Sequence, residues 1–255
     1  MKMNCELALI MPVYNEADLI GKVVKDWAQE LRKLHINFQI VVHNDGSKDE
    51  TPKILDELAT EVPELVVYHW QNSRHGPTIL RGYRMACEAE WIFQADSDGE
   101  IAPRFFEALW NERHNYDFLL GVRKPYLVSL GRRLISRTAW LLGRIFYGVK
   151  VWDTNIPFRL YRTERFAAVF SCIPEDSFTP NIVLSGASAL LGFRTFETRV
   201  TFSFRAAGES TIVRWKLVRA IAKAFSQLIT YRFLICWRSL KPAAKSYQKD
   251  NAHSP

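Results

Sequence analysis

Short apolar runs alternate with amphipathic helical patterns through the first half of this 255-residue chain, and that alternation restricts the fold more than any other feature. The runs predict strands at 6–13, 37–43, 65–70, 91–95 and 116–121. Helices are predicted at 17–34, 52–61, 78–89 and 104–114. Such alternation favours right-handed βαβ units. We therefore expect a Rossmann-like α/β fold with a mostly parallel central sheet, flanking helices and ligands at the carboxyl ends of the strands.

An acidic segment directly follows the strand predicted at 91–95. It reads Asp96-Ser97-Asp98-Gly99-Glu100, so carboxylates recur at every second position. Mg²⁺ usually takes one or two protein carboxylates together with phosphate oxygens and water, so Asp96 and Asp98 suffice as ligands, with Glu100 as a third or water-mediated one. The alternative is a solvated acidic turn before a helix that begins near Pro103. Two more strands run into polar segments, "MPVYNEADL" and "HNDGSKDET", which favours the metal and a single ligand crevice.

The second half of the chain shows a different pattern. We expect a long amphipathic helix at about 128–147, strands near 156–161 and 194–204, and a final helix from about 212. The sequence contains no internal repeat and no low-complexity linker. We therefore divide it into one domain at 1–211 and a C-terminal basic amphipathic helix with a frayed tail at 212–255.

The net charge of +7 is unevenly distributed along the chain. Between Glu209 and Asp250 there is no acid, whereas nine Lys and Arg residues fall there. A helix with a basic rim and an apolar face suits an anionic membrane surface, where each cation contributes about 1 kcal/mol. The alternative is a helix docked on its own domain. Nucleic-acid binding is not expected because no reader motif is present. The pattern leaves open whether the basic segment also mediates a homodimer.

Cysteine usage and hydropathy bear on the compartment. Cys5, Cys87, Cys172 and Cys236 lack metal-ligand spacing, which is typical of structural thiols in a reducing compartment. The apolar N-terminal stretch is too short for a signal peptide. No window reaches the roughly 18 apolar residues of a membrane-spanning helix. We expect a cytoplasmic protein without a transmembrane helix, peripheral on the inner face of the membrane.

Several motifs together resemble those of family 2 glycosyltransferases with the GT-A fold, in particular the dolichyl-phosphate mannose synthase group and related polyprenyl-phosphate glycosyltransferases. They are "MPVYNE", "HNDGSKDET", "NSRHGPTILRGYRMA", "DSDGEIAP", "GVR" at 121–123, "RRLISR" at 132–137, "DTNIPFRLYR" at 153–162 and "RAAGEST" at 205–211. The resemblance covers most of residues 6–211. It implies a metal-dependent, inverting transfer of a hexose from a UDP- or GDP-linked donor to a polyprenyl phosphate, with Mg²⁺ or Mn²⁺ as cofactor.

For the donor, the resemblance implies nucleotide contacts from Pro12, Tyr14, Glu16, Asn44 and Asp45. A Tyr ring can pack on a base or ribose, and carboxylate or amide oxygens accept hydrogen bonds from ring N–H groups. A structural alternative for Glu16 is a cap on the following helix. Family members usually carry two acids at the position of Asn44-Asp45, so the base and the sugar stay open.

For the acceptor, the resemblance implies that Arg123, Arg132, Ser136 and Arg205 bind the lipid phosphate. Guanidinium groups suit this task because they bind phosphate bidentately and remain charged. A phosphate with a second pKa near 6 is largely dianionic at neutral pH and attacks without a general base. Asp96, Asp98 and Arg123 are therefore the expected catalytic residues.

Two other readings remain at this point. If a glycan hydroxyl is the acceptor, a carboxylate base is needed, and Asp176 in the pair Glu175-Asp176 is the candidate. The alternative for that pair is a polar turn framed by Pro174 and Pro180. The other reading is a non-catalytic module that retains the fold and binds nucleotide sugars. The role of His75, in the "NSRHGP" loop, is left open between ligand contact and solvation.

Overall fold

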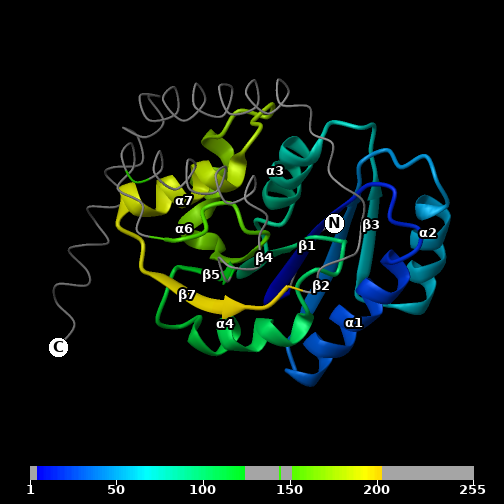
Figure 1. Ribbon diagram of the computed structural model, residues 1–255, viewed down its shortest axis with the longest axis horizontal. Helices are drawn as coiled ribbons and strands as arrows, with labels where there is room; N and C mark the ends of the chain where they lie inside the picture. The colour runs from blue at the N-terminus through cyan, green and yellow to red at the C-terminus, as the bar shows by residue number, and fades with distance from the viewer. Residues whose placement is uncertain (1–4, 124–143, 145–150, 203–255) are drawn as a thin grey trace.

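The computed structural model describes residues 5–123, 144 and 151–202, which surround one seven-stranded sheet (Figure 1). The strand order is β3-β2-β1-β4-β6-β5-β7. The strands are β1 Leu7–Val13, β2 Phe38–Asn44, β3 Leu65–His69, β4 Trp91–Ala95, β5 Phe118–Arg123, β6 Phe158–Arg162 and β7 Thr195–Val200. Only β6 runs antiparallel to its neighbours in this sheet. The predicted mostly parallel α/β architecture is confirmed.

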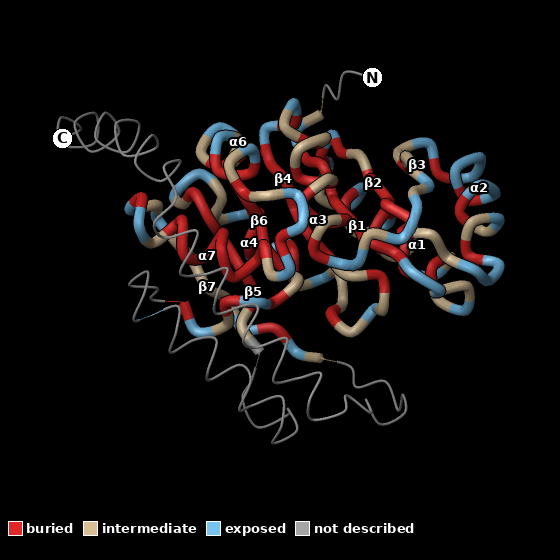
Figure 2. The backbone as a smooth tube through the Cα atoms, turned by 90° about the horizontal axis from the view of Figure 1, so that it is seen from above, coloured by how far each residue is buried: buried red, intermediate tan, exposed pale blue. Residues whose placement is uncertain are grey.

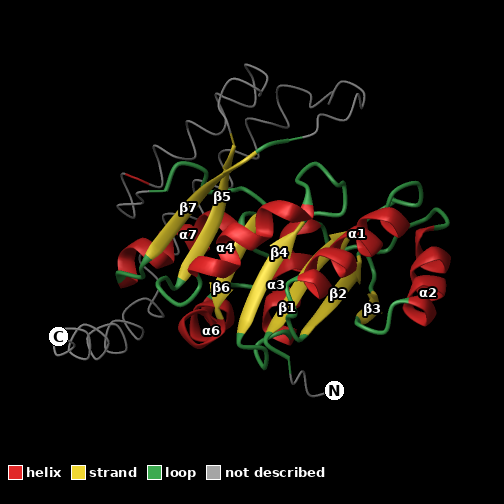
Figure 3. Cartoon of the chain, turned by 90° about the horizontal axis from the view of Figure 1, so that it is seen from below, coloured by secondary structure: helices red, strands yellow, loops and turns green. Residues whose placement is uncertain are grey.

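Helices cover both faces of the sheet (Figure 3). They are α1 Ile20–Lys33, α2 Thr51–Glu61, α3 His75–Met85, α4 Phe106–Glu112, α6 Thr163–Cys172 and α7 Pro180–Leu191, with a short 3₁₀ turn at Pro103–Phe105 before α4. One face is covered by α1 and α4, the other by α3, α6 and α7, and α2 packs beside the edge strand β3. Two helix layers around a central sheet leave only the strand ends free to build a site.

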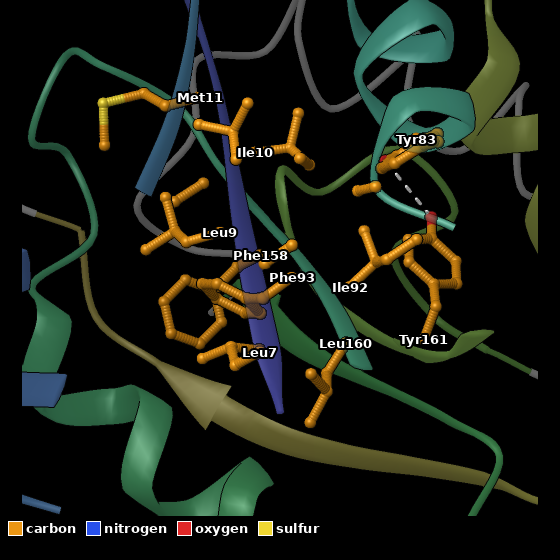
Figure 4. Close-up of a cluster of buried hydrophobic side chains, with 14 of the residues drawn as sticks. Leu7, Leu9, Ile10, Met11, Tyr83, Ile92, Phe93, Phe158, Leu160 and Tyr161 are labelled. Carbon is orange, nitrogen blue, oxygen red and sulfur yellow. Dashed lines mark hydrogen bonds between the residues drawn. The ribbon is translucent and has the colours of Figure 1, made fainter. Parts of the chain in front are cut away.

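The core is divided by the sheet into two aromatic clusters. On the α1 face, the Phe93 ring lies 5.4 Å from Trp27 and 4.8 Å from Phe158. On the α3 face, Tyr83 lies 5.3 Å from Tyr161, and Figure 4 shows the two sets of side chains on opposite sides of β1 and β4. Burial is concentrated along the central strands (Figure 2). Each buried aromatic side chain contributes about 1.5–3 kcal/mol, so the core fixes the positions of the strand ends.

The order of the strands creates a crevice at one end of the sheet. From β1 the chain builds outward through β2 and β3, then returns to place β4 on the other side of β1. In the register Val13 lies opposite Asn44, and Ile10 lies opposite Gln94, so the carboxyl ends of β1, β2 and β4 are neighbours. Ligands of open α/β sheets bind at such a switch point.

The predicted strands and helices of the first half are all found, with shifted ends. The largest shift is in α3, predicted at 78–89 but formed by His75–Met85. Helices α6 and α7 were not predicted. In α7, ten of twelve residues are buried, so the helix has no exposed polar face and its sequence lacks the clear amphipathic period that indicates a helix.

Several predictions fall on residues outside the described ranges. These are nearly all of the helix expected at about 128–147, the final helix from about 212, and the domain boundary at residue 211. Within the described ranges, no helix combines the length and apolar character needed to cross a bilayer.

Candidate active site

A cavity of about 390 Å³ lies at the carboxyl ends of β1, β2 and β4, and we call it the first cavity. It brings together six of the residues predicted to bind the nucleotide or the metal. Its lining consists of Pro12, Val13, Tyr14, Glu16, Asp45, Asn72, Arg74, His75, Thr78, Asp96, Ser97 and Asp98. Side chains separated by more than 80 residues in the sequence therefore meet in one place, as the strand-end argument predicted.

The acidic segment after β4 contributes two carboxylates to this cavity. Asp96 and Asp98 line it, whereas Glu100 does not. The segment turns sharply at Gly99, whose φ of +68° is a left-handed conformation that favours glycine. The Glu100 backbone N–H donates to Asp98 Oδ1 at 2.9 Å, which fixes one carboxylate oxygen of Asp98. The turn thus presents two acids, and the structure places the expected third one outside the cavity.

Two carboxylates fit a divalent ion of a particular kind. No group of three His, Cys, Asp or Glu side chains arranged to hold a metal exists in the part of the chain that the structure describes. Mg²⁺ and similar hard cations do not need such a group when substrate phosphate oxygens and water complete the coordination shell. The oxygen donors of Asp96 and Asp98 suit that mode of binding. They do not suit a structural site closed by protein ligands alone.

The loops after β1 and β2 are joined by hydrogen bonds. The Asn15 backbone N–H donates to Ser47 Oγ at 2.9 Å, and the Lys48 N–H donates to Asn15 Oδ1 at 2.8 Å. The Glu16 N–H donates to Thr51 Oγ1 at 2.9 Å. Because each loop satisfies polar groups of the other, the two form one wall of the first cavity. The two loops are therefore neighbours in space, although they are more than 30 residues apart in the sequence.

Tyr14 stands on this wall as an exposed aromatic ring. Its side chain is 45% exposed, although most rings of this size in the described chain are buried. An exposed ring at the edge of a polar cavity has one apolar face available for a flat partner such as a base. The carboxylate of Glu16 lines the same cavity, so its backbone position at the start of the α1 region does not exclude a ligand contact.

Asn44 and Asp45 are adjacent but have different surroundings. Asn44 is 2% exposed, donates from Nδ2 to His69 Nδ1 at 2.9 Å, and accepts from the Ser47 N–H and Oγ. It therefore lies beneath the loop and outside the lining of the cavity. Asp45 does line the cavity, and its Oδ1 accepts from the Ser73 N–H at 2.8 Å. Of the predicted pair, the structure places only Asp45 at the ligand side.

A second cavity of about 420 Å³ adjoins the first. Arg74 and His75, at the start of α3, line both. The remaining lining of the second cavity is Ser73, Gly76, Pro77, Ile79, Asn155, Asp176, Phe178, Thr179, Pro180 and Asn181. The two cavities therefore meet at the amino-terminal end of α3, where backbone N–H groups and the helix dipole favour an anion.

His75 lies at this junction and its imidazole remains open to both cavities. Loss of hydration among the surrounding protein atoms lowers the pKa of His75, and the nearby carboxylates of Asp45 and Asp98 oppose that shift. The net direction is downward, which favours the neutral imidazole. A neutral imidazole can both donate and accept a hydrogen bond there.

The acidic pair after α6 is split between two environments. Glu175 is 91% exposed and pairs with Arg84 at 3.3 Å. Asp176 is exposed and lines the second cavity. The Ser177 N–H donates to the Pro174 carbonyl at 3.1 Å, so the segment is a turn, as expected for a pair framed by prolines. Asp176 is nevertheless the carboxylate that the turn brings to a cavity.

The predicted acceptor residues are mostly beyond the described ranges. Arg123 is the last residue of β5, so its backbone lies in the sheet. Arg132, Ser136 and Arg205 fall outside the described residues. Their role as a phosphate site stays a prediction.

The cavity residues that were not singled out from the sequence include Arg74, Asn155, Thr179 and Asn181. The first two lie inside the motifs "NSRHGP" and "DTNIPFRLYR", so the motifs marked their segments without distinguishing the residues. Thr179 and Asn181 belong to the beginning of α7, which had no helical pattern. Only the packing of α7 against α3 brings them to the site.

Comparison with solved structures supports the fold. The chain is similar to residues 1–349 of TarS from Staphylococcus aureus in complex with UDP-GlcNAc, with 21% identity, a TM-score of 0.59, and coverage of 90% of this chain and 68% of that TarS chain. It is also similar to glucosyl-3-phosphoglycerate synthase from Mycobacterium tuberculosis in complex with Mn²⁺, UDP and phosphoglyceric acid, with 14% identity, a TM-score of 0.64, and coverage of 91% and 80%. The architecture of the sheet and helices is the GT-A fold.

Sequence comparison gives the family. One curated relative, undecaprenyl-phosphate 4-deoxy-4-formamido-L-arabinose transferase from Pseudomonas fluorescens, is 26% identical over 225 residues, which is 87% of this chain and 63% of the relative. The chain thus spans less than two thirds of that relative's length. The sequence model described as "Glycosyl transferase family 2" matches residues 8–167, more than half of the chain. With the first cavity built from the motifs of that segment, the chain belongs to glycosyl transferase family 2 and carries its glycosyltransferase domain.

Proposed function

We propose that this chain is a metal-dependent, inverting glycosyltransferase that moves a hexose from a UDP- or GDP-linked donor to a polyprenyl phosphate at a membrane surface. The observation that carries the proposal is the first cavity itself. It combines the two carboxylates Asp96 and Asp98 with the exposed ring of Tyr14 and the acids Glu16 and Asp45. The sites proposed for the base and for the diphosphate-bound cation therefore share one cavity.

In the donor half, Tyr14 would pack on the base or ribose, while Glu16 and Asp45 accept hydrogen bonds from donor N–H or hydroxyl groups. Asp96 and Asp98 would hold Mg²⁺ or Mn²⁺, which supplies charge neutralisation for the departing nucleoside diphosphate. Pro12, near the end of β1, lines the same cavity. Asn44 would act indirectly, because its hydrogen bonds with Ser47 fix the loop after β2.

The start of α3 would bind the diphosphate from the other side. Arg74 lines both cavities and adds a fixed positive charge next to the helix N-terminus. The neutral imidazole of His75 would donate a hydrogen bond to a diphosphate or sugar oxygen without the hydration loss of a cation. Both residues favour a negative ligand that passes from the first cavity to the second.

In the acceptor half, we assign Arg123, Arg132, Ser136 and Arg205 to the lipid phosphate. One oxygen of the dianionic phosphate attacks the anomeric carbon as the bond from that carbon to the diphosphate oxygen breaks, which inverts the configuration. No proton has to be removed from the acceptor. The name of the Pseudomonas fluorescens relative, which specifies an undecaprenyl-phosphate transferase, supports this acceptor class.

The place of action follows from the lipid acceptor. The acid-free segment between Glu209 and Asp250, with its nine cations, is suited to an anionic leaflet. We propose a cytoplasmic protein that lies peripherally on the inner face of the membrane. Binding to vesicles with and without anionic lipid would test this step separately from catalysis.

The function is tested by product extraction. The full chain is incubated with Mn²⁺, radiolabelled UDP- or GDP-sugars, and undecaprenyl phosphate in detergent. Label that moves into the organic phase supports the proposal, and undecaprenol, which lacks the phosphate, serves as the acceptor control. Label that stays in the aqueous phase with every donor, or that transfers equally to undecaprenol, would contradict it.

A second candidate has a glycan hydroxyl as acceptor and Asp176 as general base. The observation in its favour is that the Asp176 carboxylate is exposed in the second cavity. Asp176→Asn separates the candidates because it removes the base and keeps the shape. A loss of at least about a hundredfold in kcat supports the hydroxyl acceptor. A change below about threefold supports the lipid phosphate, which needs no base.

A further inference from the structure

The second cavity continues the path of the donor beyond the diphosphate. Tyr14 and Asp45 mark the nucleotide end of the first cavity, and Asp96 and Asp98 mark its diphosphate end. Arg74 and His75 line both cavities, so a group attached to the far side of the diphosphate enters the second one. This step rests on the proposed function. The group at that position is the sugar to be transferred.

Two polar groups that line the second cavity have hydrogen-bonding capacity that no other described residue satisfies. Asn181 lines the cavity although it is only 4% exposed. One end of its side-chain amide contacts the Tyr83 hydroxyl at 3.0 Å, and the other end has no hydrogen bond within the described residues. The hydroxyl of Thr179, two residues earlier, is also buried without a partner there. Buried polar groups normally find partners, so a ligand that supplies them fits this wall.

The Asn181 amide is held in place by a buried network. Arg159 Nη1 donates to the Tyr161 hydroxyl at 3.1 Å, and the Tyr161 and Tyr83 hydroxyls are 3.4 Å apart (Figure 4). Tyr83 also contacts Gln94 Oε1 at 2.5 Å. A hydroxyl has one hydrogen, so Tyr83 donates to either Gln94 or Asn181 and accepts from the other. Whichever end of the Asn181 amide bonds the Tyr83 hydroxyl, the opposite end is available to a ligand in the second cavity.

The same network fixes the adjacent wall. Arg159 is fully buried and donates to the backbone carbonyls of Asn181 at 2.9 Å, Thr154 at 2.9 Å and Ile156 at 2.7 Å. It thereby clamps the 154–156 segment, whose Asn155 lines the cavity, to the first turn of α7. Both walls are therefore preorganised, which is the condition for discriminating between similar ligands.

We propose that Asn181 is a specificity-determining residue that hydrogen-bonds one ring substituent of the transferred sugar, a hydroxyl or an acylamino group, and that Tyr83 is its positioning residue. A hydroxyl or an amide both donates and accepts, so either end of the Asn181 amide can bind it. A sugar without a suitable group at that position displaces water from the free end of the Asn181 amide and does not replace its hydrogen bond. Sites built this way reject the wrong ligand strongly.

The test compares nucleotide sugars with the bare nucleotides. Dissociation constants are measured by calorimetry with Mn²⁺ for UDP, UDP-glucose, UDP-galactose, UDP-GlcNAc, GDP and GDP-mannose. The ratio of the constant for a nucleotide to that for its sugar conjugate isolates the contribution of the sugar. In the wild-type protein one conjugate should stand out. Asn181→Ala should lower that ratio about five- to tenfold and leave the affinity for the bare nucleotide within about twofold.

Two further variants sharpen the test. Asn115→Ala, on an exposed turn before β5, is the matched control and should leave every ratio unchanged. Tyr83→Phe keeps the ring in the core but releases the amide, so the ratio should fall by a smaller factor than in Asn181→Ala. If circular dichroism shows that Asn181→Ala folds poorly, the test relies on Tyr83→Phe instead.

The failure of this inference is distinguishable from failure of the proposed function. If the wild-type protein prefers one sugar and neither Asn181→Ala nor Tyr83→Phe changes the preference, Asn181 does not determine specificity and the proposed function stands. Equal loss of affinity for bare nucleotide and conjugate would also overturn the role. If the wild-type protein binds neither nucleotides nor their conjugates, the proposed function itself fails, and this inference with it.

Discussion

The two cavities that meet at Arg74 and His75 are built differently. Around the first, the polar groups of two loops bond to each other, as in the Asn15–Ser47 and Glu16–Thr51 contacts. Around the second, polar groups at the start of α7 have hydrogen-bonding capacity that no other described residue satisfies. The joined loops form a preassembled wall for the part of the donor that the proposed function places in the first cavity. The second depends on its ligand to satisfy its walls, so variation in sugar and acceptor is expected there.

The largest expected effect comes from the carboxylates where the first cavity meets the diphosphate. Asp98→Ala should lower kcat by at least about a hundredfold, because charge stabilisation by a bound metal is worth several kcal/mol. The measurement is sugar transfer at saturating donor, with circular dichroism to show an intact fold. Glu57→Ala, an exposed acid on α2, is the control for loss of a negative charge. Full activity of Asp98→Ala would contradict a metal site in the first cavity, and the proposed difference between the two cavities would no longer hold.

An effect of comparable size, on stability, is expected when the pH is lowered, because a histidine near the first cavity is buried. His43 is fully buried on β2 and accepts a hydrogen bond from Trp70 Nε1 at 3.1 Å. Burial, together with the nearby charge of Arg81, lowers the pKa of His43 to about 4. The unfolded chain therefore takes up this proton near pH 6.5 and the folded chain only near pH 4. Stability should fall by about 3 kcal/mol as the pH drops through that window, and the loss is complete below it.

The check is urea unfolding of wild type and His43→Asn at pH 7 and at pH 4.5. The Asn oxygen can accept from Trp70 in place of the ring nitrogen but does not titrate, so the variant should lose about 2 kcal/mol less over this interval. Identical losses would show that His43 is protonated in the folded state. The wall of the first cavity would then be less rigid at β2 than its hydrogen bonds indicate.

A smaller change separates the cavities by geometry. Gly76 lies where α3 approaches the turn after α6, and a Cβ there would meet the Ser177 carbonyl oxygen at 2.3 Å and that of Phe178 at 2.9 Å. Gly76→Ala should therefore displace the turn and destabilise the protein by about 1–3 kcal/mol. Because Phe178 lines only the second cavity, affinity for a nucleotide sugar should fall while affinity for the bare nucleotide is kept.

Gly21→Ala is the matched control for this substitution. A Cβ at Gly21 meets nothing within 4 Å, and the residue lies inside α1. The change should stabilise the protein by about 0.5–1 kcal/mol. Thermal unfolding of both variants gives the comparison. If Gly76→Ala proved as stable as wild type, the turn would have to move freely, and the second cavity would not be a preorganised site.

The sequence predicted the first cavity better than the second, and the reason is physical. Residues of the first cavity follow directly from strands with strong apolar runs, so each strand end points to its site residue, as Ala95 does to Asp96. Part of the second cavity comes from the first residues of α7, Pro180 and Asn181, and this helix is mostly buried and shows no clear amphipathic period. Their position depends on long-range packing that local patterns do not contain.

Two residues predicted for the site, Asn44 and Glu100, do not line the first cavity. Asn44 and Glu100 have the right chemistry and lie next to true lining residues, but neighbouring positions on a strand or tight turn face different ways. Asn44 is therefore directed to His69 and Ser47, while Asp45 reaches the cavity. Motif spacing located the segment, but which member of each pair lines the cavity depends on the path of the backbone.

The smallest expected effect tests whether the joined loops truly serve the nucleotide. Thr51 is fully buried, and its hydroxyl accepts the hydrogen bond from the Glu16 N–H. Thr51→Val removes that acceptor at nearly constant shape, so the Glu16 segment loosens by about 1 kcal/mol. The dissociation constant for bare UDP or GDP should rise about two- to fivefold, with the sugar ratio unchanged.

Thr60→Val is the control for this change, since Thr60 bonds only the Glu57 carbonyl near the exposed end of α2. The expected effects differ between the two cavities. Loosening the loop after β1 should weaken binding of the nucleotide, whereas loosening α7 should weaken binding of the sugar. If Thr51→Val lowered the sugar ratio and spared the bare nucleotide, the donor would lie in the reverse orientation. The nucleotide would then have to occupy the second cavity, where the Thr179 hydroxyl and the free end of the Asn181 amide would contact its base instead of a sugar.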